Sequence, residues 1–258
     1  MINKRIVGVV TVKNGWAVQS FGYSSYLPLG RPEIIVENLG RWGVDEVMIQ
    51  CIDRSITNQG PDFDTLKKVS LHCRGTPLIY SGGVQTVEQG VNVIKNGADR
   101  VAVDNIMHRS PEVLEKLSLI LGLQALIGCL PLSMQDGSIK WFDYKQNLLK
   151  DFVLTWLRTE LRSFVSEIMV IDYKNEGSKA AFDLNLVEAL KLSKCNLIPC
   201  GGANTSKVIK KLFQYPFVSA VAIGNSLNYK EHAVSKLKND LDPAVVRGID
   251  YEELGIGY

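Results

Sequence analysis

Two pairs of adjacent glycines, Gly82-Gly83 and Gly201-Gly202, could bind phosphate. Each pair directly follows a short apolar run that predicts a buried strand, and the second pair comes 119 residues after the first. Without side chains, adjacent glycines let the backbone approach an anion closely and donate N–H groups to it. A lone pair is typical of a plain turn, but two pairs in matched context predict two phosphate sites.

Asparagines and a further glycine add candidate ligands to these two sites. Asn105 ends the predicted strand after the first glycine pair, and Asn225 ends the one after the second. The segment 175–178 contains Gly177 and could supply more donors, with a plain turn into a helix as the equal alternative. Together these residues predict a phosphorylated small-molecule substrate with a phosphate at each end.

The chain repeats itself about halfway along. Residues 101–105 return as 221–225, and the pattern of 52–64 returns at 171–183, with nearly the same offset as the glycine pairs. Several anchors that share one long offset indicate a duplicated half-domain rather than a solenoid. The expected units are one domain, 1–258, and two half-barrels within it, about 1–122 and 123–258.

Eight β-branched runs alternate with eight helical patterns, which is typical of a parallel α/β sheet. Strands are expected near 5–11, 46–52, 77–81, 100–104, 124–130, 167–172, 196–200 and 218–223. Helices are expected near 32–43, 62–73, 86–96, 111–121, 149–165, 183–193, 205–214 and 229–239. Eight units with a twofold repeat favour a closed (β/α)8 TIM barrel over an open doubly wound sheet, in which six strands are typical.

Two long connections, 13–31 and 133–146, follow the first and fifth predicted strands. The second contains Asp136-Gly137, a sequence that favours a tight hairpin. Loops of this length in a compact domain usually serve as lids or binding loops. For the second loop, a surface hairpin without a role is the alternative.

Composition and charge exclude several classes of protein. The net charge is +2 and no basic stretch is interleaved with aromatics, which argues against nucleic acid as a partner. The sequence has neither an apolar run near the ~18 residues of a membrane span nor a signal-peptide core, so we expect a cytoplasmic protein with no membrane partner. The five cysteines are odd in number and lack CxxC spacing, so we expect no disulfide framework and no metal site. We also expect no cofactor.

Motifs along the whole chain match a known family. They are Lys4-Arg5-Ile6, Val12-Lys13-Asn14-Gly15, Asp45-Glu46, Ser81-Gly82-Gly83-Val84, Gly97-Ala98-Asp99-Arg100-Val101, Glu167-Ile168 and Cys200-Gly201-Gly202-Ala203. As a set they resemble the HisF family, the cyclase subunits of imidazole glycerol phosphate synthase. The resemblance implies a bisphosphorylated substrate at the C-terminal mouth of the barrel. It also implies a HisH-like glutaminase on the N-terminal face that sends ammonia through the barrel.

The resemblance further implies an ammonia gate of two basic and two acidic residues at the N-terminal end. The matching residues are Arg5, Glu46, Arg100 and Glu167, with Arg100 standing where lysine is usual. Each begins a predicted strand, so the sequence itself also places both signs of charge around the barrel bottom, where pairing offsets the cost of burial. A salt-bridge ring that only stabilises the barrel is the alternative.

The chain departs from the family at the catalytic positions. HisF enzymes use two aspartates, at the ends of strands one and five, as general acid and base. Here Thr11 and Pro131 stand in those places, and neither can exchange a proton near neutral pH. Gln19 also replaces a lysine that is expected to help hold substrate.

Candidate replacements remain near the predicted strand ends. Asp53, Asp172 and Glu176 are carboxylates at or just beyond strands two and six, and Lys13 keeps a family position. Strand register decides which of them face the mouth, since a slip of one residue reverses every side chain. Asp136 is a further candidate, although its neighbour Gly137 favours a simple turn residue.

The leading hypothesis is a HisF-like subunit of a glutamine-dependent amidotransferase that delivers ammonia to a phosphorylated acceptor. The loss of both aspartates suggests that the acceptor is not the histidine intermediate, and family resemblance points to a sugar in surface-polysaccharide biosynthesis. One alternative is the ordinary imidazole glycerol phosphate synthase cyclase-lyase of histidine biosynthesis. Another is a non-catalytic scaffold that activates the glutaminase.

Overall fold

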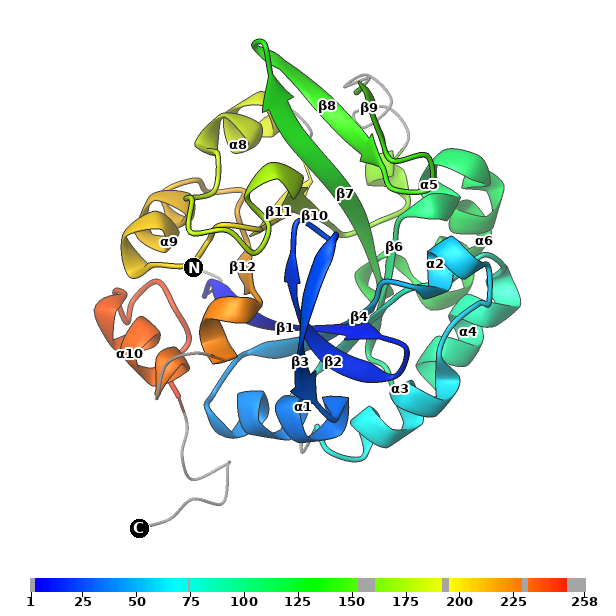
Figure 1. Cartoon of the computed structure of the whole chain (residues 1–258), viewed down its shortest axis with the longest axis horizontal. Helices are drawn as coiled ribbons and strands as arrows, with labels where there is room; N and C mark the ends of the chain where they lie inside the picture. Colours follow the sequence, from blue (N-terminus) through cyan, green and yellow to red (C-terminus); the bar gives the residue numbers. More distant parts are fainter. Residues whose placement is uncertain (1–2, 74, 153–160, 192–194, 229–231, 250–258) are drawn as a thin grey trace.

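The β-branched runs of the sequence form eight parallel strands that close into a barrel (Figure 1). This computed structural model describes residues 3–73, 75–152, 161–191, 195–228 and 232–249. Strand β12 pairs with β1, and β10 pairs with both β7 and β11, so the sheet closes on itself. The predicted TIM barrel is therefore confirmed. In order around the barrel, the strands are β1 (Arg5–Lys13), β4 (Glu46–Cys51), β5 (Leu78–Ser81), β6 (Arg100–Val103), β7 (Leu126–Gln135), β10 (Glu167–Asp172), β11 (Asn196–Cys200) and β12 (Ala220–Ile223).

Helices cover the outside of the barrel (Figure 1). The larger ones are α1 (Pro32–Arg41), α3 (Phe63–Ser70), α4 (Val87–Lys95), α6 (Pro111–Leu121), α8 (Leu184–Leu190), α9 (Ser206–Phe213) and α10 (Ala233–Asp240). Short helices lie in the connections: α2 (Arg54–Thr57), α5 (Asn105–Arg109), η1 (Leu123–Ala125), η2 (Leu161–Ser163), η3 (Tyr173–Asn175) and η5 (Asn225–Asn228). A capping box begins α4, because Thr86 accepts from the Gln89 N–H while the Gln89 side chain accepts from the Thr86 N–H.

The predicted helix 149–165 is wrong at its start. Residues Leu148–Asp151 form strand β9, which pairs with β8 (Ser138–Asp143). A hairpin partner is at hand there, so cross-strand pairing prevails over the helical spacing of the apolar residues. Residues 153–160 of that prediction lie outside the described residues, as do 192–194 and 229–231 of the helices expected at 183–193 and 229–239.

Side chains alternate between the inside and the outside of the barrel. The inner cluster takes residues from all eight strands: Val7, Val9, Met48, Ile79, Ala102, Ile127, Cys129, Met169, Ile171, Ile198, Cys200, Ala220 and Ala222. The residues between them pack outward against the helices. With a period of two, this alternation determines which polar residues near the strand ends face the barrel interior.

Two hairpins rise from the C-terminal end of the barrel, one in each half (Figure 1). After β1, strands β2 (Trp16–Phe21) and β3 (Ser25–Gly30) form the first, within the long loop expected at 13–31. After β7, strand β8 turns back through Asp136 and Gly137, which have φ angles of 49° and 75°. The predicted hairpin is confirmed, and Asp136 is its turn residue.

The five cysteines are buried and free, so they pack as small apolar side chains. Within the described residues, no helix has both the length and the apolar character needed to cross a bilayer. The same part of the chain contains no cluster of three His, Cys, Asp or Glu side chains that could hold a metal ion.

Candidate functional site

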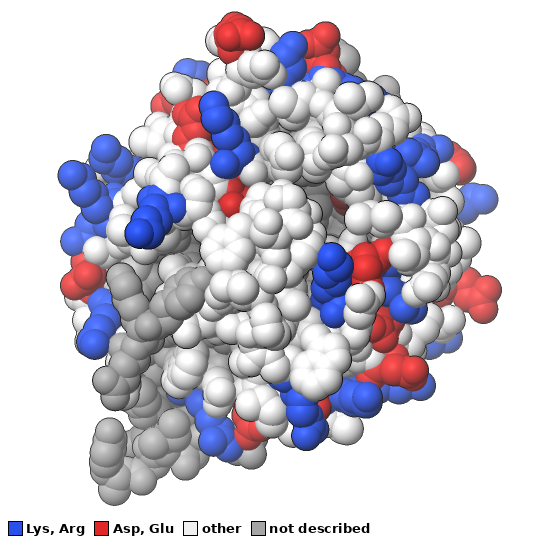
Figure 2. All heavy atoms as spheres, in the orientation of Figure 1, with Lys and Arg blue, Asp and Glu red and all other residues white. Residues whose placement is uncertain are grey.

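The C-terminal mouth contains two pockets, one against each glycine pair. The first-half pocket is lined by the Gly82-Gly83 pair, by side chains from the ends of β6 and β7, and by aromatic residues of the β7–β8 hairpin. The second-half pocket is lined by the Gly201-Gly202 pair, the loop after β10 and the start of η5. Thr11 lies in the second and Pro131 in the first. Figure 2 shows this face, where uncharged residues fill the centre and Lys and Arg lie scattered around it.

The glycines of the first pocket are required by close backbone packing. Gly82 and Gly83 have φ angles of 132° and 72°. A Cβ on Gly82 would lie 2.4 Å from the Cys51 carbonyl oxygen, and one on Gly83 would lie 2.4 Å from the Gly60 carbonyl oxygen. The Gly83 N–H already donates to Ser55 Oγ at 3.0 Å. A ligand phosphate would therefore compete with or join the Ser55 hydroxyl at this pair.

We expect Gly83→Ala to disturb the first pocket more than backbone strain alone explains. Gly15→Ala is a matched control, because Gly15 has a φ of 75° and nothing within 4 Å of the added Cβ. The control should lose about 1–2 kcal/mol of unfolding free energy from its left-handed backbone. Gly83→Ala should lose roughly 1–3 kcal/mol more from the clash, as urea denaturation can measure. Equal losses in the two variants would contradict the close packing.

The second pocket has a similar glycine pair and additional polar residues. A Cβ on Gly201 would lie 2.7 Å from the Asp172 carbonyl oxygen, and one on Gly202 would lie 2.6 Å from the Phe182 nitrogen. Ser178 of the expected segment 175–178 lines this pocket, and so do residues that the sequence reasoning missed, among them Lys179, Asn204, Thr205 and Ser226. Lys179 supplies a positive charge beside the glycines, and its place just after the segment 175–178 was the available signal.

Two residues predicted to bind phosphate also hold the β2–β3 hairpin in place. The Asn225 side chain accepts from the Ser20 N–H at 3.3 Å and donates to the Ser20 carbonyl at 2.6 Å. A Cβ on Gly177 would lie 2.0 Å from the same carbonyl oxygen, so the hairpin packs directly on that glycine. Both residues line the second-half pocket, but their described contacts are to the hairpin.

Replacing Asn225 by alanine should loosen this hairpin. Two hydrogen bonds of about 1 kcal/mol each are lost, so amide exchange at Ser20 should become at least tenfold faster. Asn204→Ala is the control, because Asn204 lines the same pocket and bonds to Lys179 rather than to the hairpin. Unchanged exchange at Ser20 in Asn225→Ala would show that the hairpin is held by other contacts.

Tyr23 separates the two pockets. It lies at the hairpin tip, lines both pockets and packs against the inner cluster, and its hydroxyl donates to Gln50 Oε1 at 3.3 Å. Glu176 fixes the tip, accepting from Ser20 Oγ and from the Tyr23 N–H, each at 3.1 Å. Burial raises the pKa of Glu176 above its usual value. A ligand that spans both glycine pairs must therefore displace Tyr23.

The other three proposed catalytic residues line neither pocket. Asp172 lies one residue beyond inward-facing Ile171, and it accepts from the Asn175 side chain at 2.7 Å and from the Asp183 N–H at 2.9 Å. Asp53 accepts from the Asn14 N–H at 2.9 Å. Lys13 Nζ lies 3.8 Å from the centre of the Tyr26 ring. These contacts hold turns and the first hairpin. Gln19, which replaces the family lysine, is buried within β2.

Asp104 is the carboxylate that strand alternation brings into the first-half pocket. It follows β6, two residues beyond the inward-facing Ala102, and it lines the pocket beside Asn105. Sequence reasoning missed it, although the even spacing from Arg100 was the available signal.

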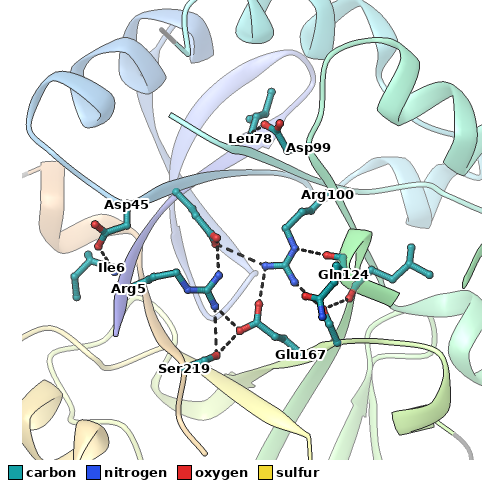
Figure 3. A network of polar contacts seen from close by, with 12 residues as sticks. Arg5, Ile6, Asp45, Leu78, Asp99, Arg100, Gln124, Glu167 and Ser219 are labelled. Atoms are coloured by element: carbon teal, nitrogen blue, oxygen red, sulfur yellow. Dashed lines mark hydrogen bonds and ion pairs between the residues drawn. The ribbon is translucent and has the colours of Figure 1, made fainter. Parts of the chain in front are cut away.

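A closed ring of charges fills the other end of the barrel (Figure 3). Arg5 bonds to Glu46 at 2.6 Å and also to Glu167. Arg100 bonds to Glu167 at 2.6 Å and lies 3.8 Å from Glu46. Ser219 donates to Glu167 as well. The four predicted gate residues thus contact one another with alternating charge, and the longest side of the ring lies between Arg100 and Glu46.

The two glutamates of the ring have opposite pKa shifts. Burial raises the pKa of Glu46 above its usual value, and this outweighs its two arginines. Burial acts on Glu167 too, but Arg100, Arg5 and the Ser219 hydroxyl together hold its pKa below the usual value. Glu46 Oε2 has no hydrogen-bond donor among the described residues, which fits the weaker side of the ring.

The family profile described as histidine biosynthesis protein matches residues 5–233, which include all eight strands and both ends of the barrel. The chain belongs to this family. It is 24% identical over 240 residues to a putative imidazole glycerol phosphate synthase subunit hisF2 of Vibrio vulnificus, covering 92% of this chain and 88% of that one. HisF subunits of the same synthase from Thermococcus gammatolerans and Bacillus cereus are 26% and 25% identical, covering 93% and 95% of this chain and 96% and 98% of theirs. The chain is thus a divergent, HisF-like member.

Proposed function

We propose that this HisF-like chain is the synthase subunit of a glutamine-dependent amidotransferase. A HisH-like glutaminase docks on the N-terminal face, and ammonia passes from the Arg5/Glu46/Arg100/Glu167 ring to a phosphorylated acceptor at the opposite mouth. The observation that carries the proposal is the position of that ring, on the inner face of the barrel directly below two glycine-lined pockets. The relatives named as synthase subunits support a partner of this kind.

The acceptor in this proposal is not the histidine intermediate. Thr11 and Pro131 lie in the two pockets, where they offer no proton-exchanging group near neutral pH. The hisF2 and hisF3 subunits of Vibrio vulnificus show that one organism can hold more than one HisF-type protein, which supports a second role for a paralogue. A sugar of surface-polysaccharide biosynthesis fits the aromatic walls and polar ends of the pockets.

The first test concerns the acceptor. Purified chain is incubated with the bisphosphorylated histidine-pathway substrate and an ammonium salt, beside an authentic HisF subunit as positive control. We expect no ring formation above the uncatalysed rate. Ring formation at a normal enzymic rate would overturn this part of the proposal and would identify the chain as an ordinary cyclase-lyase.

The second test concerns the partner and the passage. Glutamine hydrolysis by a HisH-type glutaminase should be stimulated when this chain is added, and the Arg100→Glu variant should weaken this effect. Arg100→Lys is the matched control because it keeps the positive charge. If neither the wild-type chain nor the control binds or stimulates the glutaminase, docking on the N-terminal face is wrong.

A scaffold role is the second candidate, since Tyr23 fills the mouth and Asn225 holds the hairpin closed. It predicts that bulky replacements of Gly82 and Gly201 leave stimulation of the glutaminase intact. It also predicts that phosphorylated ligands show no saturable binding. Saturable binding to the wild-type chain, lost in both variants, would reject the scaffold in favour of the synthase.

A further inference from the structure

Asp104 has the position of a helix cap but does not act as one. It is the N-cap residue of α5, with φ −132° and ψ −73°, and its side chain makes no capping hydrogen bond. Its Oδ1 atom is buried and has no hydrogen-bond partner among the described residues. Aspartate at an N-cap normally accepts a backbone N–H from the first turn. This carboxyl is therefore available to a ligand in the first-half pocket, which it lines.

A second unpartnered group faces the same pocket from the turn between β8 and β9. The Tyr144 hydroxyl oxygen is also buried without a hydrogen-bond partner in the described part of the chain. Tyr144 lies close enough to Asp104 for each to affect the other's pKa, and Ser55 also acts on the pKa of Tyr144. Buried polar groups are usually satisfied, so these two neighbouring oxygens, neither with a hydrogen bond of good geometry, mark a place in the pocket where a polar ligand could bind.

The surroundings of Asp104 suit proton exchange near neutral pH. Burial raises its pKa to about 7. The groups that act on it or sense its charge are Tyr144, Asp143 and Lys145 from the β7–β8 hairpin region, Arg109 of α5, and Cys129 of β7. Asp143 reinforces the increase, whereas Tyr144, Lys145 and Arg109 oppose it. An acid or base is most effective when its pKa lies near the working pH.

The position is also specific to one half of the barrel. In the repeat of 101–105 at 221–225, the residue equivalent to Asp104 is Gly224, so the second half has no carboxyl at this position. Strand β6 pairs directly with β7, where Pro131 stands in place of the family aspartate. Asp104 thus lies one strand away from the position that the missing acid would occupy.

We propose that Asp104 is the proton-transfer group of the first-half pocket, acting on a phosphorylated acceptor that carries a carbonyl group. The inference rests on the proposed function for the supply of ammonia. The ammonia nitrogen bonds to the carbonyl carbon while the π pair of the C=O bond moves to oxygen. The Asp104 carboxylate takes one proton from nitrogen and returns it to oxygen, which leaves a carbinolamine and an unchanged carboxylate. Tyr144 positions the carboxyl and the acceptor oxygen.

The test uses the full chain labelled with ¹³C at the aspartate carboxyls, and ribose 5-phosphate as the probe. Asp104→Asn identifies the Asp104 resonance, and Tyr144→Phe is a second variant that leaves the carboxyl in place. In the wild type, we expect this resonance to titrate near pH 7 and to shift when the probe binds. Between pH 6 and 8, the affinity of the wild type for the probe should change by a larger factor than the affinity of Asp104→Asn does. The two factors should differ tenfold for each unit by which probe binding shifts the pKa of Asp104.

Each other outcome contradicts a definite part of this reasoning. The inference is wrong if Asp104 titrates near the ordinary pKa of an aspartate. It is also wrong if probe binding neither shifts the Asp104 resonance nor depends on Asp104. In both cases the proposed function still stands. If neither ribose 5-phosphate nor inorganic phosphate binds the wild-type chain saturably, both the inference and the proposed acceptor site are wrong. The phosphate of the probe also titrates in this pH range, but it affects wild type and variant equally and therefore cancels when the two are compared.

Discussion

Replacing Glu167 by glutamine should lower the free energy of unfolding by about 3 kcal/mol at pH 7. The Glu167 side chain is only 8% exposed and lies between Arg5 and Arg100. Removing its charge leaves two arginines to share Glu46, whose Oε2 is 3.8 Å from Arg100. Breaking a buried pair by removing one partner is costly because the remaining charges lose their compensation. Urea denaturation of the wild type and variant measures the difference.

The pH dependence of this effect has a definite sign. The folded-state pKa of Glu167 is held below its unfolded value. Its contribution is therefore fully present above about pH 4.5 and is lost as the pH falls through the folded pKa. Glu188→Gln is the control, because Glu188 pairs with Lys191 on the surface, where such pairs contribute little to stability. A loss no larger than that of the control would mean that the ring contributes little to stability.

Asp104→Asn should make the protein more stable at pH 8, by up to about 4 kcal/mol. The folded-state pKa of Asp104 is raised to about 7 from an ordinary 3.8. Between these values the folded chain holds a proton that the unfolded chain has released, so wild-type stability falls as the pH rises from about 4 to about 7. Asparagine has no charge to bury, so the variant lacks this loss.

The measurement is the difference in unfolding free energy between variant and wild type at pH 5, 6, 7 and 8. It should grow steadily with pH and level off above the folded pKa. Asp172→Asn provides the contrast, since Asp172 accepts hydrogen bonds from Asn175 and Asp183, so this variant should be less stable than the wild type at pH 5. Burial raises the pKa of Asp172 as well, so its difference should change with pH in the same direction as that of Asp104→Asn. A flat difference for Asp104→Asn would mean that the carboxyl is charged without cost in the folded state. A gain in stability at a ligand-binding residue is typical of functional sites.

The barrel could be predicted from the sequence because its signals are local. Each strand contains a short apolar run, and eight such runs with a twofold repeat favour a closed barrel. The hairpin at Asp136-Gly137 was predictable for the same reason, since the turn type demands those residues. The helix expected at 149–165 failed because Lys140 and Trp141 of β8 offered Asp151 and Lys150 a cross-strand pairing. A helical periodicity in the sequence does not reveal such a partner.

The sites depended on information that the sequence does not display directly. The charged ring was predictable because Arg5, Glu46, Arg100 and Glu167 all begin strands. The docking of the first hairpin on Gly177 and Asn225 was not, because it joins loops about 150 and 200 residues apart. Asp104 could not be found from the repeat, because the equivalent position in the second half is Gly224. The next residues, Asn105 and Asn225, are the same in both halves.

The docking of the β2–β3 hairpin on the second half has an evolutionary consequence. After a gene duplication, the two halves begin with identical sequences. One half can then change as long as the other half keeps the original function. Here Asn225 and Gly177 hold the β2–β3 hairpin against the second half. The corresponding region beside Asn105 instead lines a pocket together with the acidic side chain of Asp104. The two half-barrels that the sequence repeat predicts thus differ in the side chains around their glycine pairs, so an ancestral half-barrel that formed a homodimer would have either the hairpin contacts at both sites or the acidic side chain at both sites.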